Sequence, residues 1–290
     1  IVARTWPRRP EPSDEGARAP ARRHGSLKGV FPYGLVRRSP MAVRDPFATE
    51  RILRFPGDNR RMRKRALRIG SKEPGTVAWL DGCLRPGDRF WDVGANMGIY
   101  SLFAAVRLEP GSVFAFEPHA ANFASLVRTV ALNPEHRIEP LAIALDAEDG
   151  FLDFAYHRLD AGSTGSQLAS SPVGLDHVAP AVERKAAFAA DALVARSALP
   201  APTVVKIDVD GAEGRILEGM QGLLAAGTVR TLQVEVNPGQ RSAISTRLEA
   251  AGYRCTGEHY SAAGRAHVER SPDEEYPVNL VFERAGGGSA

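Results

Sequence analysis

The sequence contains little cysteine and no long apolar run. Its 290 residues include two cysteines, Cys83 and Cys255, and neither belongs to a C-x-x-C pair or another spacing typical of a metal site. Two isolated cysteines do not form a disulfide framework, so we expect a reduced, cytoplasmic protein. No stretch reaches the roughly 18 apolar residues that a membrane-spanning helix needs. The Arg- and Pro-rich start also lacks the apolar core of a signal peptide.

Acidic residues are scarce at the beginning of the chain. Residues 1–70 carry 18 Lys and Arg against 6 Asp and Glu, whereas the remaining 220 residues carry 19 against 28. The basic segment RRMRKRALR, residues 60–68, is compatible with binding to nucleic acid or to an acidic membrane. No aromatic residues interleave with it, which favours a solvated helix face. We therefore expect no nucleic-acid partner, and a non-catalytic nucleic-acid-binding protein is kept as an alternative.

Residues 1–45 are rich in Arg, Pro, Ala and Gly and show no repeating pattern. This composition is typical of disordered segments, so we expect a disordered, basic N-terminal extension. The first methionine is Met41, and we hypothesise that translation starts there. One domain is expected over residues 46–290.

Strand-like and helix-like segments alternate after residue 88. This order predicts an α/β fold with a mostly parallel sheet. The predicted strands of the sheet cover residues 89–93, 111–118, 138–145, 203–210, 229–236, 253–259 and 278–284. The predicted helices cover residues 60–69, 73–84, 99–108, 119–133, 189–197, 214–225 and 244–252. We expect an additional exposed strand over residues 150–157 and then a long Gly- and Ser-rich connection over residues 159–180.

Ligands of an open α/β sheet bind beyond the carboxyl ends of its strands. The first such end carries DVGANMG, residues 92–98, whose glycines permit a tight turn and close packing of the next helix. Glu117 ends the second strand, 19 residues after the last glycine of that loop, where an acid accepts the two hydroxyls of a ribose. Leu145 and Asp146 end the third strand, where an adenine ring is expected. The fourth strand ends in KIDVDGAE, residues 206–213.

The loop at residues 92–98 lacks the G-x-G-x-x-G spacing of a dinucleotide site. Asn96 replaces the middle glycine, and Asp92 places a carboxylate near the helix N-terminus that would hold a pyrophosphate. A carboxylate favours a cationic ligand. S-adenosylmethionine carries an ammonium and a sulfonium group and no phosphate, whereas NAD carries two phosphates. The loop therefore favours S-adenosylmethionine, and a nicotinamide-dependent oxidoreductase is the alternative enzyme.

Three segments in this order resemble the FkbM family of class I S-adenosylmethionine-dependent methyltransferases. They are FWDVGANMGIYS (90–101), VFAFEPHAANFASL (113–126) and VVKIDVDGAEGRILEGM (204–220), and the similarity extends from KEPGTVAWL (72–80) to LQVEVNP (232–238). The resemblance implies a Rossmann-like, seven-stranded, mostly parallel sheet with helices on both faces and an antiparallel last strand. It also implies O-methylation of a small molecule, a sugar or glycan, or a secondary metabolite.

The resemblance assigns individual residues to the cofactor. Next to the methionine part it places Asp92, Gly94, Ala95, Asn96, Gly98, Tyr100 and Ser101. It implies that Glu117 binds the ribose with Pro118 and Asn122 nearby, that Leu145 and Asp146 lie by the adenine, and that Asp208 lies nearest the reacting methyl group. Within the domain we expect an N-terminal helix over 70–88, a cofactor-binding core over 89–240, C-terminal strands over 241–285 and a tail over 286–290.

A base helps to remove the proton of an acceptor hydroxyl. Asp208 is the first candidate by position, and Glu235, at the end of the fifth predicted strand, is the second. Asp210 and Glu213 are alternatively explained as caps of the helix that begins near Gly211. Carboxylates at these positions also suit a divalent cation. No histidine accompanies them in the sequence, so we expect no metal.

The connection at residues 160–172 is expected to border the methyl acceptor. Polar side chains in and before it offer hydrogen bonds suited to a polyhydroxylated compound such as a sugar. We predict acceptor contacts for His157, Ser163, Thr164 and Gln167. Composition alone favours a flexible surface linker. Neither the identity of the acceptor nor the oligomeric state follows from the sequence.

Overall fold

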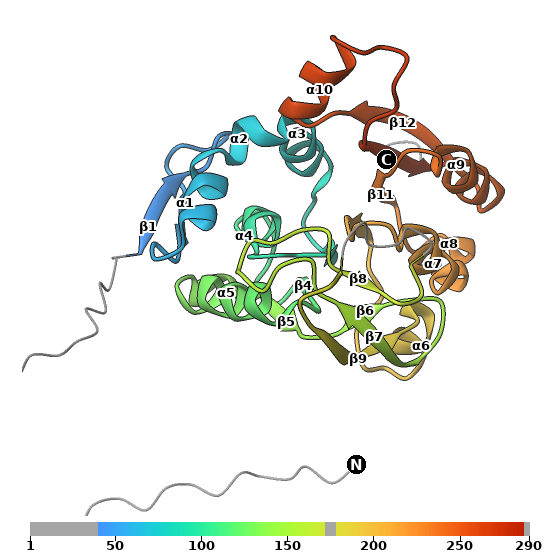
Figure 1. The fold of residues 1–290 in the computed structure, drawn as a ribbon, viewed down its shortest axis with the longest axis horizontal. Helices are drawn as coiled ribbons and strands as arrows, with labels where there is room; N and C mark the ends of the chain where they lie inside the picture. The colour runs from blue at the N-terminus through green and yellow to red at the C-terminus, as the bar shows by residue number, and fades with distance from the viewer. Residues whose placement is uncertain (1–39, 172–177, 287–290) are drawn as a thin grey trace, which may run out of the picture. The chain divides into compact units, whose positions relative to one another are not determined.

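The computed structural model describes residues 40–171 and 178–286. The disorder predicted for residues 1–39 and the tail predicted at 287–290 lie outside the described residues. Seven of the described strands form a central sheet (Figure 1). Across this sheet the strands are β12 (Tyr253–His259), β13 (Val278–Arg284), β11 (Thr231–Val236), β10 (Val204–Ile207), β3 (Phe90–Val93), β4 (Val113–Phe116) and β5 (Glu139–Leu141). β13 is antiparallel to both neighbours and the other adjacent pairs are parallel, which confirms the predicted fold class.

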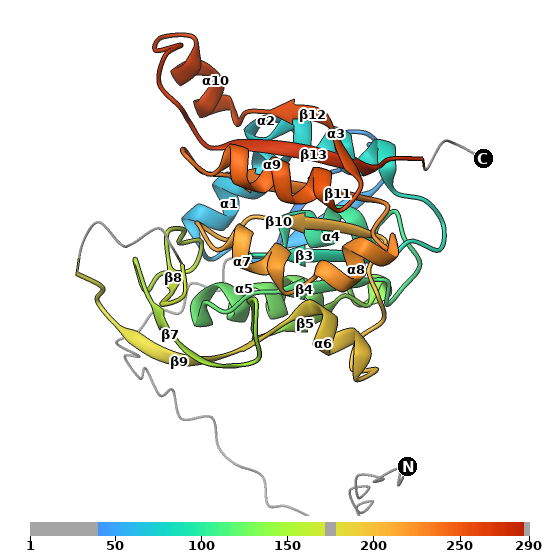
Figure 2. The same cartoon turned by 90° about the vertical axis from the view of Figure 1, so that its right-hand side faces the viewer.

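The strands at the centre of the sheet are buried on both faces and mostly apolar, with Asp92 and Lys206 as the exceptions. Every residue of β3, β4 and β10 is buried, as expected for parallel strands that helices cover. Ile207 of β10 pairs with Val93 of β3, and Val93 pairs with Phe116 of β4. These strands therefore end at the same level, and the residues that follow them meet at one edge of the sheet (Figure 2).

Helices cover both faces of the central sheet, as the resemblance implies. Buried side chains of one core come from α3 (Pro74–Cys83), α4 (Ile99–Ala105) and α5 (Ala120–Ala131). A second core takes side chains from α6 (Ala190–Ala195), α7 (Glu213–Glu218), α8 (Gln221–Ala226) and α9 (Arg241–Ala250). Further helical segments include the 3-10 turn η1 (Pro134–His136) and α10 (Ala262–Val268). None of the helices in the described part of the chain combines the length and apolar character that crossing a bilayer requires.

The third predicted strand, residues 138–145, is wrong as one continuous strand. Its first part is β5, where Pro140 has no N–H for a further partner and therefore suits an edge strand. Its second part is β6 (Ala144–Leu145), which leaves the central sheet because Leu145 pairs with Phe188 of β9. A separate sheet results, with the order β6-β9-β7-β8. Its other strands are β7 (Gly150–Ala155), β8 (Gln167–Leu168) and β9 (Val182–Phe188).

The helix predicted over residues 214–225 is interrupted and forms α7 and α8. The break lies at Gly219, where a Cβ atom would be 2.0 Å from the carbonyl oxygen of Asp146. Asp191 fixes the start of α8, because its carboxylate accepts the N–H groups of Gly222 (2.6 Å) and Leu223 (2.9 Å). The close contact of Gly219 with the backbone of Asp146 and the cap from Asp191 therefore explain why two helices form where the sequence predicts one.

The described chain begins with a hairpin. β1 (Met41–Arg44) pairs antiparallel with β2 (Ile52–Phe55), so residues 41–44 form a strand inside the segment expected to be disordered. Asp45, just after β1, is buried and forms an ion pair with Arg107 (2.6 Å) beyond the end of α4. The next helices are α1 (Arg60–Leu67) and α2 (Ile69–Lys72), which lead into α3.

Candidate functional site

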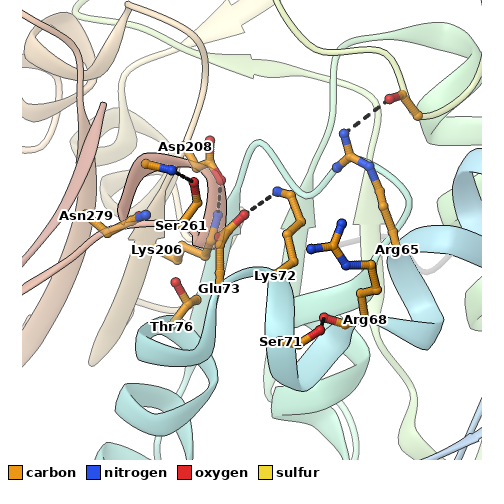
Figure 3. Close-up of polar contacts among 12 residues, drawn as sticks. Arg65, Arg68, Ser71, Lys72, Glu73, Thr76, Lys206, Asp208, Ser261 and Asn279 are labelled. Atoms are coloured by element: carbon orange, nitrogen blue, oxygen red, sulfur yellow. Dashed lines mark hydrogen bonds and ion pairs between the residues drawn. The ribbon is translucent and has the colours of Figure 1, made fainter. Parts of the chain in front are cut away.

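A cavity of about 420 Å³ opens where β3, β4 and β10 end. The loops after these strands form part of its wall, and α1, α2 and the start of α3 form another part. Residues of the loop at 163–168 and of the segment before β13 complete it. The cavity therefore lies at the carboxyl ends of the parallel strands, where open α/β sheets bind ligands. Figure 3 shows the part of the site between α1, α2, α3 and β10.

The loop after β3 approaches the end of β10 closely. Gly94 has a φ of +82°, and a Cβ atom there would lie 1.9 Å from the carbonyl oxygen of Asp208. Asn96 has a φ of 53°, a left-handed conformation that asparagine tolerates. At Gly98 a Cβ atom would lie 2.6 Å from Cδ1 of Leu126 in α5. The glycines therefore provide the tight turn and the helix packing that the sequence predicts. The loop residues on the cavity wall are Gly94, Ala95 and Asn96.

Glu117 follows β4, and backbone groups hold its carboxylate. Its Oε2 accepts the N–H of Asn96 (2.6 Å), and its Oε1 accepts the N–H of His119 (2.7 Å). The side chain is buried and lines the cavity together with Pro118 and Asn122. Burial raises the pKa of Glu117 to about 7, although the two backbone N–H groups oppose the rise. The carboxyl group therefore changes its charge near neutral pH.

Asp92 lies beneath the loop after β3 and not on the cavity wall. Its Oδ2 accepts the hydroxyl of Ser101 (2.5 Å), and its Oδ1 has no hydrogen-bond partner among the described residues. Burial raises the pKa of Asp92, while the charge of Lys206 opposes the rise. Gly98 and Ser101 also lie behind the wall, whereas Tyr100 lines it. Asp92 thus supports the loop from below, next to a buried positive charge.

The end of β6 supplies an apolar part of the wall. Leu145 lines the cavity together with Ile216 of α7. Asp146 is fully buried away from the wall. Its Oδ1 forms an ion pair with Arg215 Nε (2.5 Å), and its Oδ2 accepts the hydroxyl of Ser170 (2.6 Å). Protein groups therefore occupy the carboxylate that the sequence places by an adenine.

A buried lysine and two carboxyl groups lie where β10 and β11 end. Lys206 is 1% exposed, and its Nζ lies 2.7 Å from Asp208 Oδ2 and 5.1 Å from the centre of the Tyr100 ring. Burial alone raises the pKa of Asp208, but the charge of Lys206 and a hydrogen bond from Glu235 outweigh it and lower the pKa. The charge of Asp208, and then burial, raises the pKa of Glu235 well above its usual value. Within this pair the negative charge therefore lies on Asp208 and the proton on Glu235.

Charged side chains from α1, α2 and the start of α3 line a further part of the cavity (Figure 3). Glu73 is 4% exposed, forms an ion pair with Lys72, and has no partner for its Oε2 among the described residues. Arg65 donates a hydrogen bond to the carbonyl oxygen of Gly162 (3.2 Å). Sequence reasoning missed these residues and Lys206 as site residues, because no local pattern brings α1–α3 beside β10. Only the resemblance of KEPGTVAWL pointed toward Lys72 and Glu73.

The loop predicted to border the acceptor is fastened to the loops after β3 and β4. Asn122 accepts the N–H of Gly162 (2.6 Å) and donates to the carbonyl oxygen of Ser163 (3.1 Å). Asn96 donates to the same oxygen (2.9 Å). Ser163 and Thr164 line the cavity. The described part of this loop is therefore an anchored wall and not the surface linker that its composition favours.

His157 and Gln167 do not lie on the cavity wall. The amide of Gln167 donates to the carbonyl oxygen of Asp210 (2.9 Å), and the carboxylate of Asp210 accepts the N–H of Gly165 (2.6 Å). Glu213, the first residue of α7, accepts the N–H of Gly211 in the turn before the helix (3.1 Å), and no side chain of the described residues caps α7. Asp210 is therefore an anchor of the loop, and the capping role considered for Asp210 and Glu213 is wrong.

Comparisons with known proteins give a consistent result. The family described as Methyltransferase FkbM domain matches residues 92–255. The chain is 29% identical over 161 residues to hexuronic acid methyltransferase AglP of Haloferax volcanii, which covers 56% of this chain and 61% of that protein. It is 28% identical over 160 residues to 31-O-demethyl-FK506 methyltransferase FkbM of Streptomyces tacrolimicus, which covers 48% of this chain and 61% of that protein. The chain thus matches less than two thirds of the length of these relatives.

A solved structure of methyltransferase FkbM from Methylobacillus flagellatus is similar with a TM-score of 0.49 and 16% identity. The similarity covers 73% of this chain and 48% of that chain. The fold described above rests on the strand order of this chain itself.

Proposed function

The chain belongs to the methyltransferase FkbM domain family, and we propose that it transfers a methyl group from S-adenosylmethionine to a hydroxyl oxygen. The acceptor is a small molecule, a sugar or glycan, or a secondary metabolite. One observation supports this function above the others. A single cavity has the buried carboxyl group of Glu117 on the β4 side of β3 and the ionised carboxylate of Asp208 on the β10 side.

The residues present fit S-adenosylmethionine. The loop at residues 94–98 contains no Lys or Arg to bind a pyrophosphate, and the unpartnered oxygen of Asp92 beneath it disfavours an anion. Glu117 is placed to accept the ribose hydroxyls, and Leu145 offers an apolar surface to the adenine. Gly94, Ala95, Asn96 and Tyr100 would hold the methionine part. When bound, this cofactor supplies a methyl group that is already activated on a sulfonium sulfur.

Asp208 is the proposed proton acceptor. Lys206 keeps it ionised, and protonated Glu235 donates a hydrogen bond to it, so its orientation is fixed. These contacts make Asp208 a weak base. A weak base is sufficient here, because a hydroxyl oxygen becomes strongly acidic while it forms a bond to carbon. The protein then acts mainly by positioning the acceptor hydroxyl.

The names of two relatives support an oxygen acceptor, because one names a hexuronic acid and the other an O-demethyl compound. Ser163 and Thr164 on the cavity wall suit a hydroxylated acceptor. The proposal includes a methyltransferase domain from about residue 46 onward, preceded by β1, and a cytoplasmic location. No observation on the described residues favours an oxidoreductase or a nucleic-acid-binding protein.

Calorimetric titration of the full chain with S-adenosylhomocysteine tests this function. We expect binding that weakens by about tenfold or more in Glu117→Ala, because hydrogen bonds to a charged group are lost. Glu139→Ala, which removes an exposed acid of neighbouring β5, should bind like the wild type. A titration with NADH should show no binding. Binding of NADH without binding of S-adenosylhomocysteine would favour the oxidoreductase instead.

A further inference from the structure

The basic segment at residues 60–68 lies beside the cavity, and binding of the proposed cofactor does not explain its positive charge. Arg65 in α1 and Lys72 at the end of α2 line the cavity, and Arg68 stands between them in the chain with an exposed side chain. Arg65 belongs to α1, Arg68 lies at the break between α1 and α2, and Lys72 ends α2. Figure 3 labels all three residues and shows Lys72 next to Glu73. We define Arg65 and Lys72 as the cationic wall.

Arg65 carries a charge that no carboxylate of the described residues neutralises by an ion pair. Its guanidinium donates to the carbonyl oxygen of Gly162 (3.2 Å), which fixes the side chain, and its charge acts on Asp210 without a direct ion pair. The neighbouring Asn59 fastens the same loop by donating to the carbonyl oxygen of Ala161 (3.2 Å). A half-buried guanidinium in a fixed position is well suited to bind a carboxylate or phosphate through several N–H groups.

The nearby acids are already occupied. Glu73 forms its ion pair with Lys72, and Asp208 forms its ion pair with Lys206. Asp210 accepts the N–H of Gly165 (2.6 Å). On this wall Arg65 is thus a cation without a direct ion pair among the described residues, while the carboxylate proposed to receive a proton lies on the same cavity at Asp208.

We propose that the methyl acceptor carries an anionic group, a carboxylate or a phosphate, which binds the cationic wall while its hydroxyl lies at Asp208. This inference rests on the proposed methyltransferase function and narrows its substrate class. It also explains the basic segment without nucleic acid. Arg65 is the residue of that segment that lines the cavity, and the segment contains no aromatic residue on which a nucleic-acid base could stack.

The test compares three sugars that differ at one position: methyl glucoside, methyl glucuronide and methyl glucoside 6-phosphate. Their binding to the full chain saturated with S-adenosylhomocysteine is measured by ligand-observed NMR at constant ionic strength. We expect at least one anionic sugar to bind about tenfold more tightly than methyl glucoside, as a charge-assisted hydrogen-bond pair provides. The anion that binds better identifies carboxylate or phosphate as the source of the charge.

Arg65→Gln should remove this preference and leave binding of methyl glucoside and S-adenosylhomocysteine unchanged. Lys64→Gln is the matched control, because Lys64 is an exposed cation on the same helix that does not line the cavity. Lys72→Gln is a second test of the wall should Arg65→Gln fold poorly, and it should weaken the preference too. The inference is overturned if neither anion is preferred, or if the preference survives in both variants. Absence of S-adenosylhomocysteine binding by the wild type would instead contradict the proposed function.

Discussion

Two sides of the same cavity are built in different ways. The proposed cofactor side consists of residues 94–96, Glu117 and Leu145; its wall is made of backbone groups and apolar surface, and two N–H groups hold Glu117. The proposed acceptor side consists of Arg65, Lys72, Glu73, Asp208 and the loop at 160–168, and charged side chains dominate it. Backbone hydrogen-bonding groups keep their positions through many side-chain substitutions, whereas one mutation changes a side-chain charge. The first construction suits a ligand shared by a family, and the second suits an acceptor that differs between members.

The largest effect that separates the two sides is expected for Asp208→Asn. The amide cannot take the proton of the acceptor hydroxyl, so the methylation rate should fall by about 10²- to 10³-fold, within the range of general-base catalysis. Affinity for S-adenosylhomocysteine should change far less. The rate is measured as release of S-adenosylhomocysteine with an acceptor that the wild type methylates, and thermal unfolding checks that Lys206 tolerates the loss of its partner.

Asp153→Asn provides the control for this substitution, because Asp153 is an exposed acid of β7 outside the cavity. It should keep the wild-type rate. If Asp208→Asn lowered cofactor affinity as much as rate, Asp208 would belong to the cofactor side and the division drawn above would be wrong.

A smaller effect concerns the cofactor side alone and depends on pH. The pKa of Glu117 is raised to about 7 in the folded protein, mainly by burial. The ionised form of Glu117 is the one that accepts two ribose hydroxyls. At a pH below this pKa, Glu117 must therefore lose its proton before the ligand binds. Affinity for S-adenosylhomocysteine should therefore rise about tenfold between about pH 6 and about pH 8. Calorimetry at both pH values measures the change.

Glu117→Gln should bind more weakly and lose most of this pH dependence. Other carboxyl groups near the cavity also titrate in this range, because burial raises the pKa of Asp210 to about 6 and that of Glu213 to about 7. An unchanged pH dependence in Glu117→Gln would assign the effect to one of these groups.

The same division explains which parts of the site the sequence could predict. The cofactor side follows strand ends in chain order, so local patterns placed Gly94, Asn96, Glu117 and Leu145 on one cavity correctly. Asp146 shows the limit of that reasoning. Its position at a strand end was right, but its partner Arg215 lies 69 residues away and occupies its carboxylate. A competing tertiary partner leaves no local signal in the sequence.

On the acceptor side, the charged residues of α1, α2 and the start of α3 were beyond prediction, for a related reason. Asp208 at its strand end was predicted, but Arg65 and Glu73 come from a helix and a helix start that only the folded chain brings beside it. The second sheet was also missed in part. β9 has three consecutive charged residues, Glu183, Arg184 and Lys185, so its pattern resembles a surface segment until its pairing with β6 and β7 is known.

The smallest predicted effect falls on the residue that joins the two sides. Asn122 lies in α5, shortly after Glu117 in the chain. It holds the acceptor loop through hydrogen bonds to Gly162 and Ser163. Asn122→Ala leaves the N–H of Gly162 without its partner and the carbonyl oxygen of Ser163 with Asn96 as its remaining donor. Opening of the loop should become about fivefold more frequent, as loss of about 1 kcal/mol of net hydrogen bonding implies. Hydrogen–deuterium exchange of the peptide that covers residues 160–168 measures this change.

Asn133→Ala is the matched control for Asn122→Ala. Asn133 is a buried asparagine near the other end of α5 that donates to the carbonyl oxygens of Arg54 (2.8 Å) and Thr129 (2.7 Å), away from the cavity wall. Its replacement should lower stability without faster exchange at residues 160–168. If Asn122→Ala loosens the loop but leaves affinity for S-adenosylhomocysteine intact, the acceptor side can change while the cofactor side stays fixed. Equal losses on both sides would mean that the loop and the cofactor loops form one unit, because Asn96 contacts both Glu117 and Ser163.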